Sequence, residues 1–302
     1  KKFVTSGVDW PPLHAVYTAG VLRKQGHDVS YSRIVPKEPL FELVIIPSSI
    51  VAHETELQAI LSVVKLSIPV IAIGPFATHF AQPYIQAGAS VVMGEPEMFF
   101  VSTQLDITFC EQMHQKLTVK TSLDLDELPY PAWDLILKDQ KIFHGFLSGS
   151  SPTIPINATR GCPYSCSYYC TYPLQQGKKV RKRDPSEVVK EMIYWQDNYN
   201  ITNFIFRDPV FSIDARHSEE ICDRIIHTNR KFKFAIETHL KNVNEKLAIK
   251  LKKAGLELVY VGIESSEKEV LSTAKRHTES IDLQRQKIKM LENLGIKVKG
   301  LY

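Results

Sequence analysis

Three cysteines within nine residues are the part of this sequence best suited to chemistry. Cys162, Cys166 and Cys170 lie in the segment TRGCPYSCSYYCTYP, residues 159–173. Cysteine thiolates are soft ligands, and three of them in one short loop suit a soft metal ion or an iron–sulfur cluster. A cubane cluster held by three cysteines keeps one iron without a protein ligand, and that iron is free to bind a small molecule.

Two other interpretations of the cysteine loop remain open at this point. A structural zinc site would need a fourth ligand, and the loop contains no histidine to supply it. The three thiols can also be unliganded. Of the remaining cysteines, Cys222 lies in the apolar helical pattern HSEEICDRIIHT, which predicts a core thiol. The surroundings of Cys110 assign it no role.

The elements around the loop predict a barrel or part-barrel in the second half of the chain. Asp184-Pro185-Ser186-Glu187 is a strong helix start, with a cap residue followed by proline at the first helical position. A second helix opens at Asn244 and closes at Gly255, and a third spans 280–294. In barrels built of such units the active site lies at the carboxyl ends of the strands. The expected strands are 153–158, 203–207, 233–237, 257–262 and 296–301.

Residues 1–100 predict a doubly wound parallel sheet covered on both faces. Expected strands at 42–47 and 69–73 alternate with expected helices at 12–26 and 54–66. Ligands of such sheets bind at the carboxyl ends of the strands. In this sequence those ends are Ser48–Ser49, Gly74–Phe76 and Met93–Glu95.

We expect one domain at 1–100, a connector at 101–150 and a second domain at 151–302. The connector contains LDELPYPAWDLI at 125–136, whose prolines break both helix and sheet.

The cysteine loop resembles that of the radical S-adenosylmethionine (SAM) superfamily, both in RGCPYSC and in the aromatic residue before the last cysteine. In that family a 4Fe-4S cluster binds SAM through its open iron and cleaves it to a 5′-deoxyadenosyl radical. The family spacing is three residues and then two, whereas here it is three and three, because Tyr168 and Tyr169 both precede Cys170. One extra residue adds up to ~3.8 Å of chain, which either forms a bulge or misplaces the third thiolate.

The resemblance implies SAM contacts at the ends of the expected strands. Asp208, Glu237, Glu264 and Ser265 match the positions of amino-group and ribose contacts, and Tyr169 or Tyr168 matches the adenine contact. The role of His239 stays open between an acid–base group and a scaffold residue.

The first domain resembles the cobalamin-binding domain that precedes the barrel in one radical SAM subgroup. The resemblance rests on VDWPPLHAVYTAGVLRKQGHDV, on GPFATHFAQPYIQAGAS with VVMGEPE, and on the connector. It implies that the loops at Gly74 and Gly94 let a corrin ring approach the backbone. The cobalt-ligand pattern Asp-x-His-x-x-Gly is absent, and we expect His53 and His79 to be solvent-facing or capping residues. The alternative is a domain that only supports the barrel or positions a substrate.

Together these features predict an α/β protein with a Rossmann-like sheet followed by a partial (β/α)6 radical SAM barrel. The implied function is SAM cleavage followed by cobalamin-dependent methyl transfer to carbon. The alternatives are cyclisation or rearrangement without methyl transfer, and a cobalamin- or metabolite-binding module that has lost cluster chemistry. A small-molecule or natural-product-like substrate and an electron donor such as flavodoxin or ferredoxin are expected.

Composition is consistent with a cytoplasmic protein. The 302 residues carry a net charge of +4, which does not demand a nucleic-acid partner. No apolar run approaches the ~18–20 residues of a membrane span, and the amino terminus lacks signal-peptide features. Because the chain has no initiator Met and ends as a strand begins, we expect a fragment whose barrel is incomplete.

Overall fold

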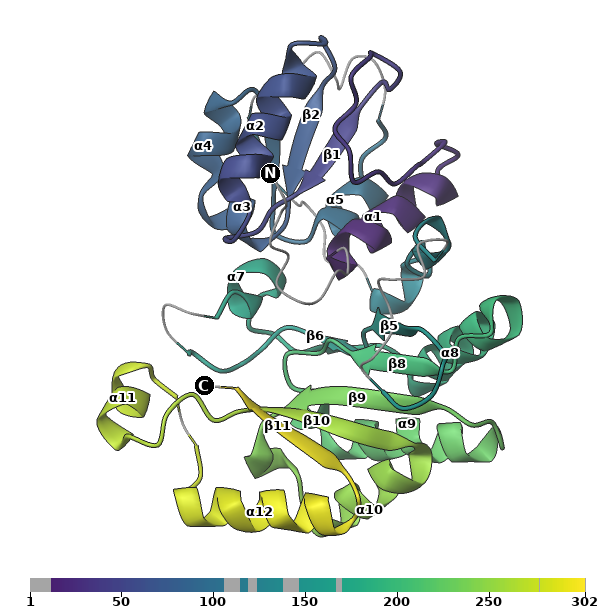
Figure 1. Cartoon of the computed structure of the whole chain (residues 1–302), viewed down its shortest axis with the longest axis vertical. Helices are drawn as coiled ribbons and strands as arrows, with labels where there is room; N and C mark the ends of the chain where they lie inside the picture. The colour runs from purple at the N-terminus through teal and green to yellow at the C-terminus, as the bar shows by residue number, and fades with distance from the viewer. Residues whose placement is uncertain are drawn as a thin grey trace. The chain divides into compact units, whose positions relative to one another are not determined.

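The structure is a computed structural model that describes residues 12–105, 115–118, 124–137, 147–166, 170–276 and 278–301. The chain divides into two units (Figure 1). Pro11–Lys138 and Thr171–Gly177 make up the first unit, and Asp139–Cys170 with Lys178–Tyr302 make up most of the second. None of the helices in the described parts of the chain has the length and apolarity needed to cross a bilayer.

The first unit is a parallel sheet in the order β1-β2-β3-β4. Its strands are β1 (Val44–Pro47), β2 (Val70–Ile73), β3 (Ser90–Met93) and β4 (Lys116–Thr118). Its helices are α1 (Leu13–Lys24), α2 (His53–Val64), α3 (Pro75–His79), α4 (Ala81–Gln86), α5 (Pro96–Val101) and α7 (Tyr172–Gln176), with short 3-10 turns at Leu125–Glu127 and Trp133–Leu135.

Both faces of the first sheet are covered, as the sequence predicts. Ile71 and Ile73 of β2 pack with α1 and α5, whereas Val70 and Ala72 pack with α2 and α4. This alternation follows from the two-residue period of a strand. Residues in the expected connector also belong to this unit, because β4 is its fourth strand and the backbone N–H of Ala132 donates to Val16 O at 2.9 Å.

The second unit is a five-stranded parallel sheet in the order β11-β10-β9-β8-β5. Its strands are β5 (Thr153–Ile156), β8 (Asn203–Phe206), β9 (Lys233–Thr238), β10 (Leu256–Gly262) and β11 (Lys297–Leu301). Its helices are α8 (Pro185–Tyr199), α9 (Ala215–His227), α10 (Glu245–Ala254), α11 (Lys268–Thr273) and α12 (Ile281–Asn293), with 3-10 turns at Phe211–Ile213 and Leu240–Asn242. Sequence neighbours are therefore spatial neighbours throughout the sheet (Figure 1).

Local signals fix the helix ends in the second unit. Asp184 accepts from Ser186 N and caps α8, and Asn244 accepts from Leu247 N and caps α10. Gly255 ends α10 with φ +113°, and a Cβ at this position would lie 2.1 Å from Phe232 O. A side chain at Gly255 would therefore push α10 and β10 away from the start of β9.

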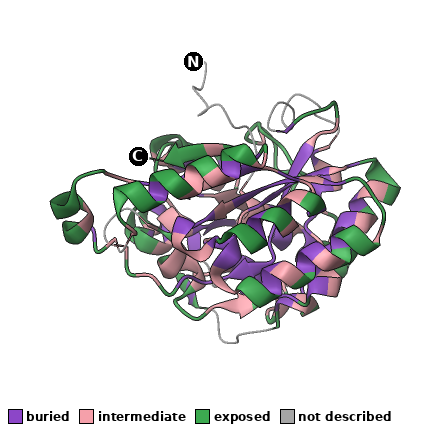
Figure 2. Ribbon diagram, turned by 90° about the horizontal axis from the view of Figure 1, so that it is seen from below, coloured by how far each residue is buried: buried purple, intermediate pink, exposed green. Residues whose placement is uncertain are grey.

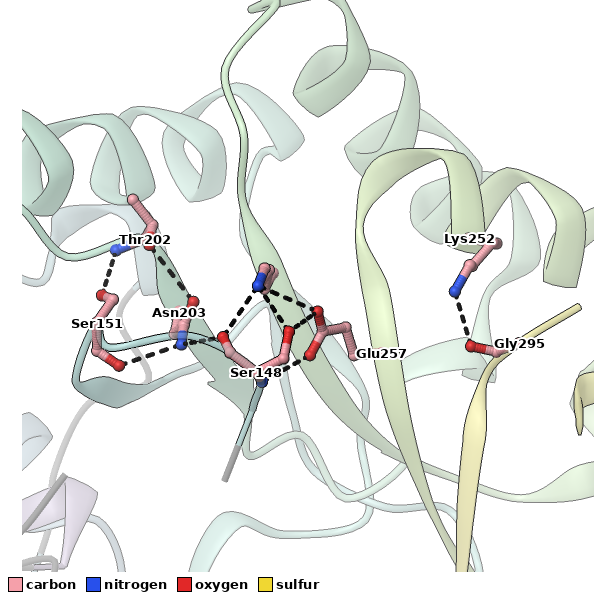
Figure 3. A network of polar contacts seen from close by, with 8 residues as sticks. Ser148, Ser151, Thr202, Asn203, Lys252, Glu257 and Gly295 are labelled. Carbon is pink, nitrogen blue, oxygen red and sulfur yellow. Dashed lines mark hydrogen bonds and ion pairs between the residues drawn. The ribbon is translucent and has the colours of Figure 1, made fainter. Parts of the chain in front are cut away.

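The amino-terminal ends of these strands are closed by residues 147–151. Leu147 packs on Ile205, Ala235 and Leu258, which lie on one face of β8, β9 and β10. The next residue, Ser148, donates its backbone N–H to Glu257 at 2.8 Å (Figure 3). Figure 2 shows that buried residues follow the strands, whereas the outer faces of the helices are exposed. The segment at 147–151 is thus a plug at the end of the sheet opposite the strands' carboxyl ends.

Leu147→Ala is expected to lower the free energy of unfolding by about 2–4 kcal/mol, because it removes the apolar contacts of this plug. Urea unfolding of the variant and of Leu283→Ala, a change at a more exposed leucine of α12, measures the effect. Equal stability of the two variants would contradict the assignment of Leu147 to the core.

Candidate functional site

The cysteine loop is closed at its base by a short antiparallel ladder. β6 (Thr159–Arg160) pairs with β7 (Arg181–Lys182), so the chain leaves and returns at the carboxyl end of β5. Cys162 is buried, Cys166 and Cys170 are half-buried, and none of the three forms a disulfide. Tyr168 and Tyr169, the predicted adenine contacts, lie outside the described residues.

Arg183 holds one side of the loop base. Its backbone N–H donates to Ala158 O at 2.9 Å, and its guanidinium donates to Asn157 O at 3.0 Å. The same guanidinium forms a buried ion pair with Glu191 of α8. Because a buried charge is costly unless it is paired, these contacts specify one position for the chain at residues 157–158.

Tyr164, between the first two cysteines, anchors the loop to the turn that follows β9. Its ring lies 5.7 Å from that of His239, and the Lys241 ammonium lies 4.1 Å from the Tyr164 ring centroid. His239 is buried, and its Nδ1 accepts from Lys241 N. Of the two roles left open by the sequence, this geometry supports a scaffold residue.

Arg276 is a site residue that the sequence analysis missed. Its guanidinium lies 3.6 Å from the Cys166 sulfur and donates to Gly262 O at 2.7 Å. Its Nη2 is also 3.9 Å from Glu264 Oε1. A Cβ at Gly262 would lie 2.4 Å from that nitrogen, so a side chain there would displace the end of Arg276. Arg276 lies well beyond the end of β10, so no local spacing marks it as a partner of the cysteines.

Burial raises the pKa of the Cys162 thiol, Cys166 raises it further, and Arg276 counteracts the shift. The Arg276 charge thus offsets part of the cost of forming the Cys162 thiolate, the form that binds a metal.

The predicted SAM contacts lie at strand ends with different environments. Glu237 forms an ion pair with Arg207. Glu264 has a positive φ of 64° and donates its backbone N–H to Leu301 O. Ser265 Oγ accepts from Glu267 N at 3.0 Å. Through Arg276, Glu264 is brought close to Cys166 of the cysteine loop.

Asp208 has a different environment from the other predicted contacts. It is fully buried, and its carboxylate accepts hydrogen bonds from Ala158 N and Thr159 Oγ1, each at 2.9 Å. Burial raises the pKa of Asp208 to about 7. The carboxylate is therefore turned towards the base of the cysteine loop and not towards solvent.

The donor set of the loop fits an iron–sulfur cluster by type, with three cysteines that form no disulfide and a guanidinium next to one of them. Within the described ranges, no three His, Cys, Asp or Glu side chains lie close enough together to hold one metal ion. That the three thiols bind one cluster together is therefore a proposal, which is argued under the proposed function. Cys222 is fully buried in α9, which confirms its assignment to the core.

The carboxyl edge of the first sheet, where the sequence predicts a ligand, has polar groups near its strands and exposed apolar residues further out. At Gly74, with φ +105°, a Cβ would lie 2.7 Å from His14 Nε2, so the His14 ring fills that space. Gly94 donates its backbone N–H to Thr78 Oγ1 at 3.2 Å. Ile50 and Val51, which follow β1, are 71% and 77% exposed.

The two histidines at this edge have local partners. His53 Nδ1 lies 3.2 Å from Ile50 O, and the His79 ring contacts that of Phe80. Ala52 is the N-cap residue of α2 and the helix has no side-chain cap hydrogen bond, so His53 does not cap it.

Residues 156–302 match the model of the radical SAM superfamily. An uncharacterized methyltransferase of Pyrococcus horikoshii is 28% identical over 49% of this chain and 31% of its own length. An anaerobic magnesium-protoporphyrin IX monomethyl ester cyclase of Cereibacter sphaeroides is 25% identical over 95% of this chain and 52% of its own length. The chain thus spans about a third to a half of these relatives.

The fold is similar to a solved structure over nearly its whole length. The radical SAM methyltransferase TsrM from Kitasatospora setae, with cobalamin and a [4Fe-4S] cluster bound, superposes with a TM-score of 0.71 at 16% identity, covering 99% of this chain and 67% of TsrM. Both units therefore share their fold with that protein, and residues 156–302, which contain the cysteine loop, match the radical SAM superfamily model.

Proposed function

We propose that this chain is part of a radical SAM enzyme that holds a 4Fe-4S cluster on Cys162, Cys166 and Cys170. The observation that carries the proposal is the loop itself, because three cysteines that form no disulfide lie on a closed hairpin at the carboxyl end of a parallel sheet. When bound, the cluster would supply the electron that cleaves SAM to a 5′-deoxyadenosyl radical. The match of this segment to the superfamily model supports the same assignment.

The chain's own residues would hold and orient the cofactors. Arg276 places a positive charge and a hydrogen-bond donor beside Cys166, which would stabilise the negative charge that the cluster gains on reduction. Glu264, next to Arg276, offers a carboxylate to a ribose hydroxyl or an amino group at the end of β10. Glu237 would do the same at the end of β9.

The first unit would bind cobalamin, and the overall reaction would be methyl transfer to carbon. The exposed apolar residues Ile50 and Val51, next to the polar loop ends of the sheet, suit the rim of a flat and largely apolar ligand. The substrate would be a small molecule, and a flavodoxin- or ferredoxin-like donor would reduce the cluster.

Cyclisation without methyl transfer is the second candidate reaction. A specific observation favours it, since the relative that matches 95% of this chain is named a cyclase. The two reactions share the cluster and the SAM site, so they differ only in the steps after radical formation.

Replacing Cys162, Cys166 or Cys170 with Ala is expected to abolish stable binding of the cluster, because each change removes one of three thiolate ligands. Iron and sulfide content after anaerobic reconstitution measures this. Cys222→Ala is the matched control and should load like the parent, since that thiol is in the core. Undiminished iron in all three variants would refute the cluster assignment.

Arg276→Gln is expected to lower the midpoint potential of the cluster, because the reduced form loses a neighbouring positive charge. A redox titration followed by electron paramagnetic resonance gives the potential. Arg285→Gln, at an exposed arginine of α12, should leave the potential at the parent value. If both variants have the parent potential, Arg276 does not contact the cluster environment.

Ile50→Glu is expected to weaken binding of hydroxocobalamin about tenfold or more, because it places a carboxylate at the apolar rim of the first sheet. Spectral titration of hydroxocobalamin measures the affinity. Leu61→Glu is the control, since Leu61 is an exposed leucine near the opposite end of α2. If the parent and Ile50→Glu bind hydroxocobalamin with equal affinity, Ile50 is not part of the cobalamin site.

A further inference from the structure

We infer that Asp208 is a positioning residue that fixes the base of the cysteine loop and thereby sets where Cys162 lies. The inference rests on the proposed function, because it takes this loop to be the cluster-binding loop. The carboxylate of Asp208 binds the base of the loop, whereas its position in the sequence suggested a contact with SAM.

Asp208 reaches the loop from the neighbouring strand. β8 pairs with β5 in the register Ile156↔Phe206, and Asp208 follows the end of β8 just where the chain leaves β5. One carboxylate oxygen accepts from Ala158 N and the other from Thr159 Oγ1, both at 2.9 Å. The residue is 0% exposed, so it presents no surface to a dissolved ligand.

The peptide at Ala158 is held from both sides. Asp208 accepts from its N–H, and the backbone N–H of Arg183 donates to its carbonyl oxygen at 2.9 Å. Thr159 then pairs with Lys182 in the ladder that closes the loop. Cys162 is only three residues further on, a reach of at most about 11 Å, so a shift of the base is carried to the first thiol.

The hydrogen bonds of Asp208, more than its charge, carry this role. The groups that donate to it are all neutral: the Ala158 backbone amide and the Thr159 hydroxyl, together with the Asn157 side chain and the Thr159 backbone amide. Burial raises the pKa of Asp208 to about 7. A protonated carboxyl, or an asparagine amide, can accept from Ala158 N with its oxygen and donate to Thr159 Oγ1. Asparagine is therefore a close substitute, whereas alanine removes these contacts.

The test compares Asp208→Ala with Asp208→Asn after anaerobic reconstitution with iron and sulfide. Competition with an iron chelator should show an affinity for iron about 10–100-fold lower in Asp208→Ala, the usual cost of removing a group that orients a metal ligand. Asp208→Asn should keep the parent affinity. Leu147→Ala, which destabilises the same unit at the opposite end of the strands, should also keep it. SAM affinity is measured for every variant that retains the cluster.

Several outcomes would overturn the inference. If Asp208→Ala keeps the cluster and binds SAM more weakly, Asp208 contacts SAM, and the proposed function still stands. If Asp208→Asn loses iron as Asp208→Ala does, the charge is what matters. If Leu147→Ala loses iron to the same degree, the effect is loss of stability. A parent protein that binds no cluster would overturn the proposed function together with the inference.

Discussion

The hydrogen bonds at the base of the cysteine loop are the interactions on which the proposed chemistry depends. A long loop that carries three ligands loses conformational freedom when the ligands meet, and this cost is smaller when its ends are already fixed. Here the ends are fixed by a two-residue ladder, by Arg183 and by Asp208. The side chains of Arg183 and Asp208 are buried, so any displacement would leave them unpaired at considerable cost.

In the second unit, the residues proposed for the chemistry and those that close the core lie at opposite edges of the sheet. In a sheet whose strands are all parallel, every carboxyl end lies at the same edge, and loops at that edge can change without disturbing the core. The cysteine loop and the residues around Arg276 lie at this edge. At the other edge, Leu147 and the Ser148–Glu257 contacts close the sheet with a plug that takes no part in the proposed reaction (Figure 3).

Features that depend on local chemistry could be predicted from the sequence. The caps at Asp184 and Asn244 and the stop at Gly255 each follow from residue types within one helical turn. The strands of the second unit could be predicted because they are apolar and regularly spaced. In the first unit, β4 was missed because three residues carry too little periodicity, and its neighbourhood was interpreted as a connector.

Features that depend on tertiary contacts could not be predicted. Asp208 was correctly placed at a strand end, but a sequence does not tell whether a carboxylate there turns to solvent or to a neighbouring strand. The approach of Arg276 to Cys166 joins residues far apart in the chain. The short pairing of β6 with β7 has no hydrophobic pattern at all, although it closes the loop.

The most direct test of the cluster assignment is the electron paramagnetic resonance spectrum of the reconstituted, reduced protein, recorded with and without SAM. A four-iron signal that changes when SAM is added is the predicted result, whereas no cluster signal, or one indifferent to SAM, would contradict it.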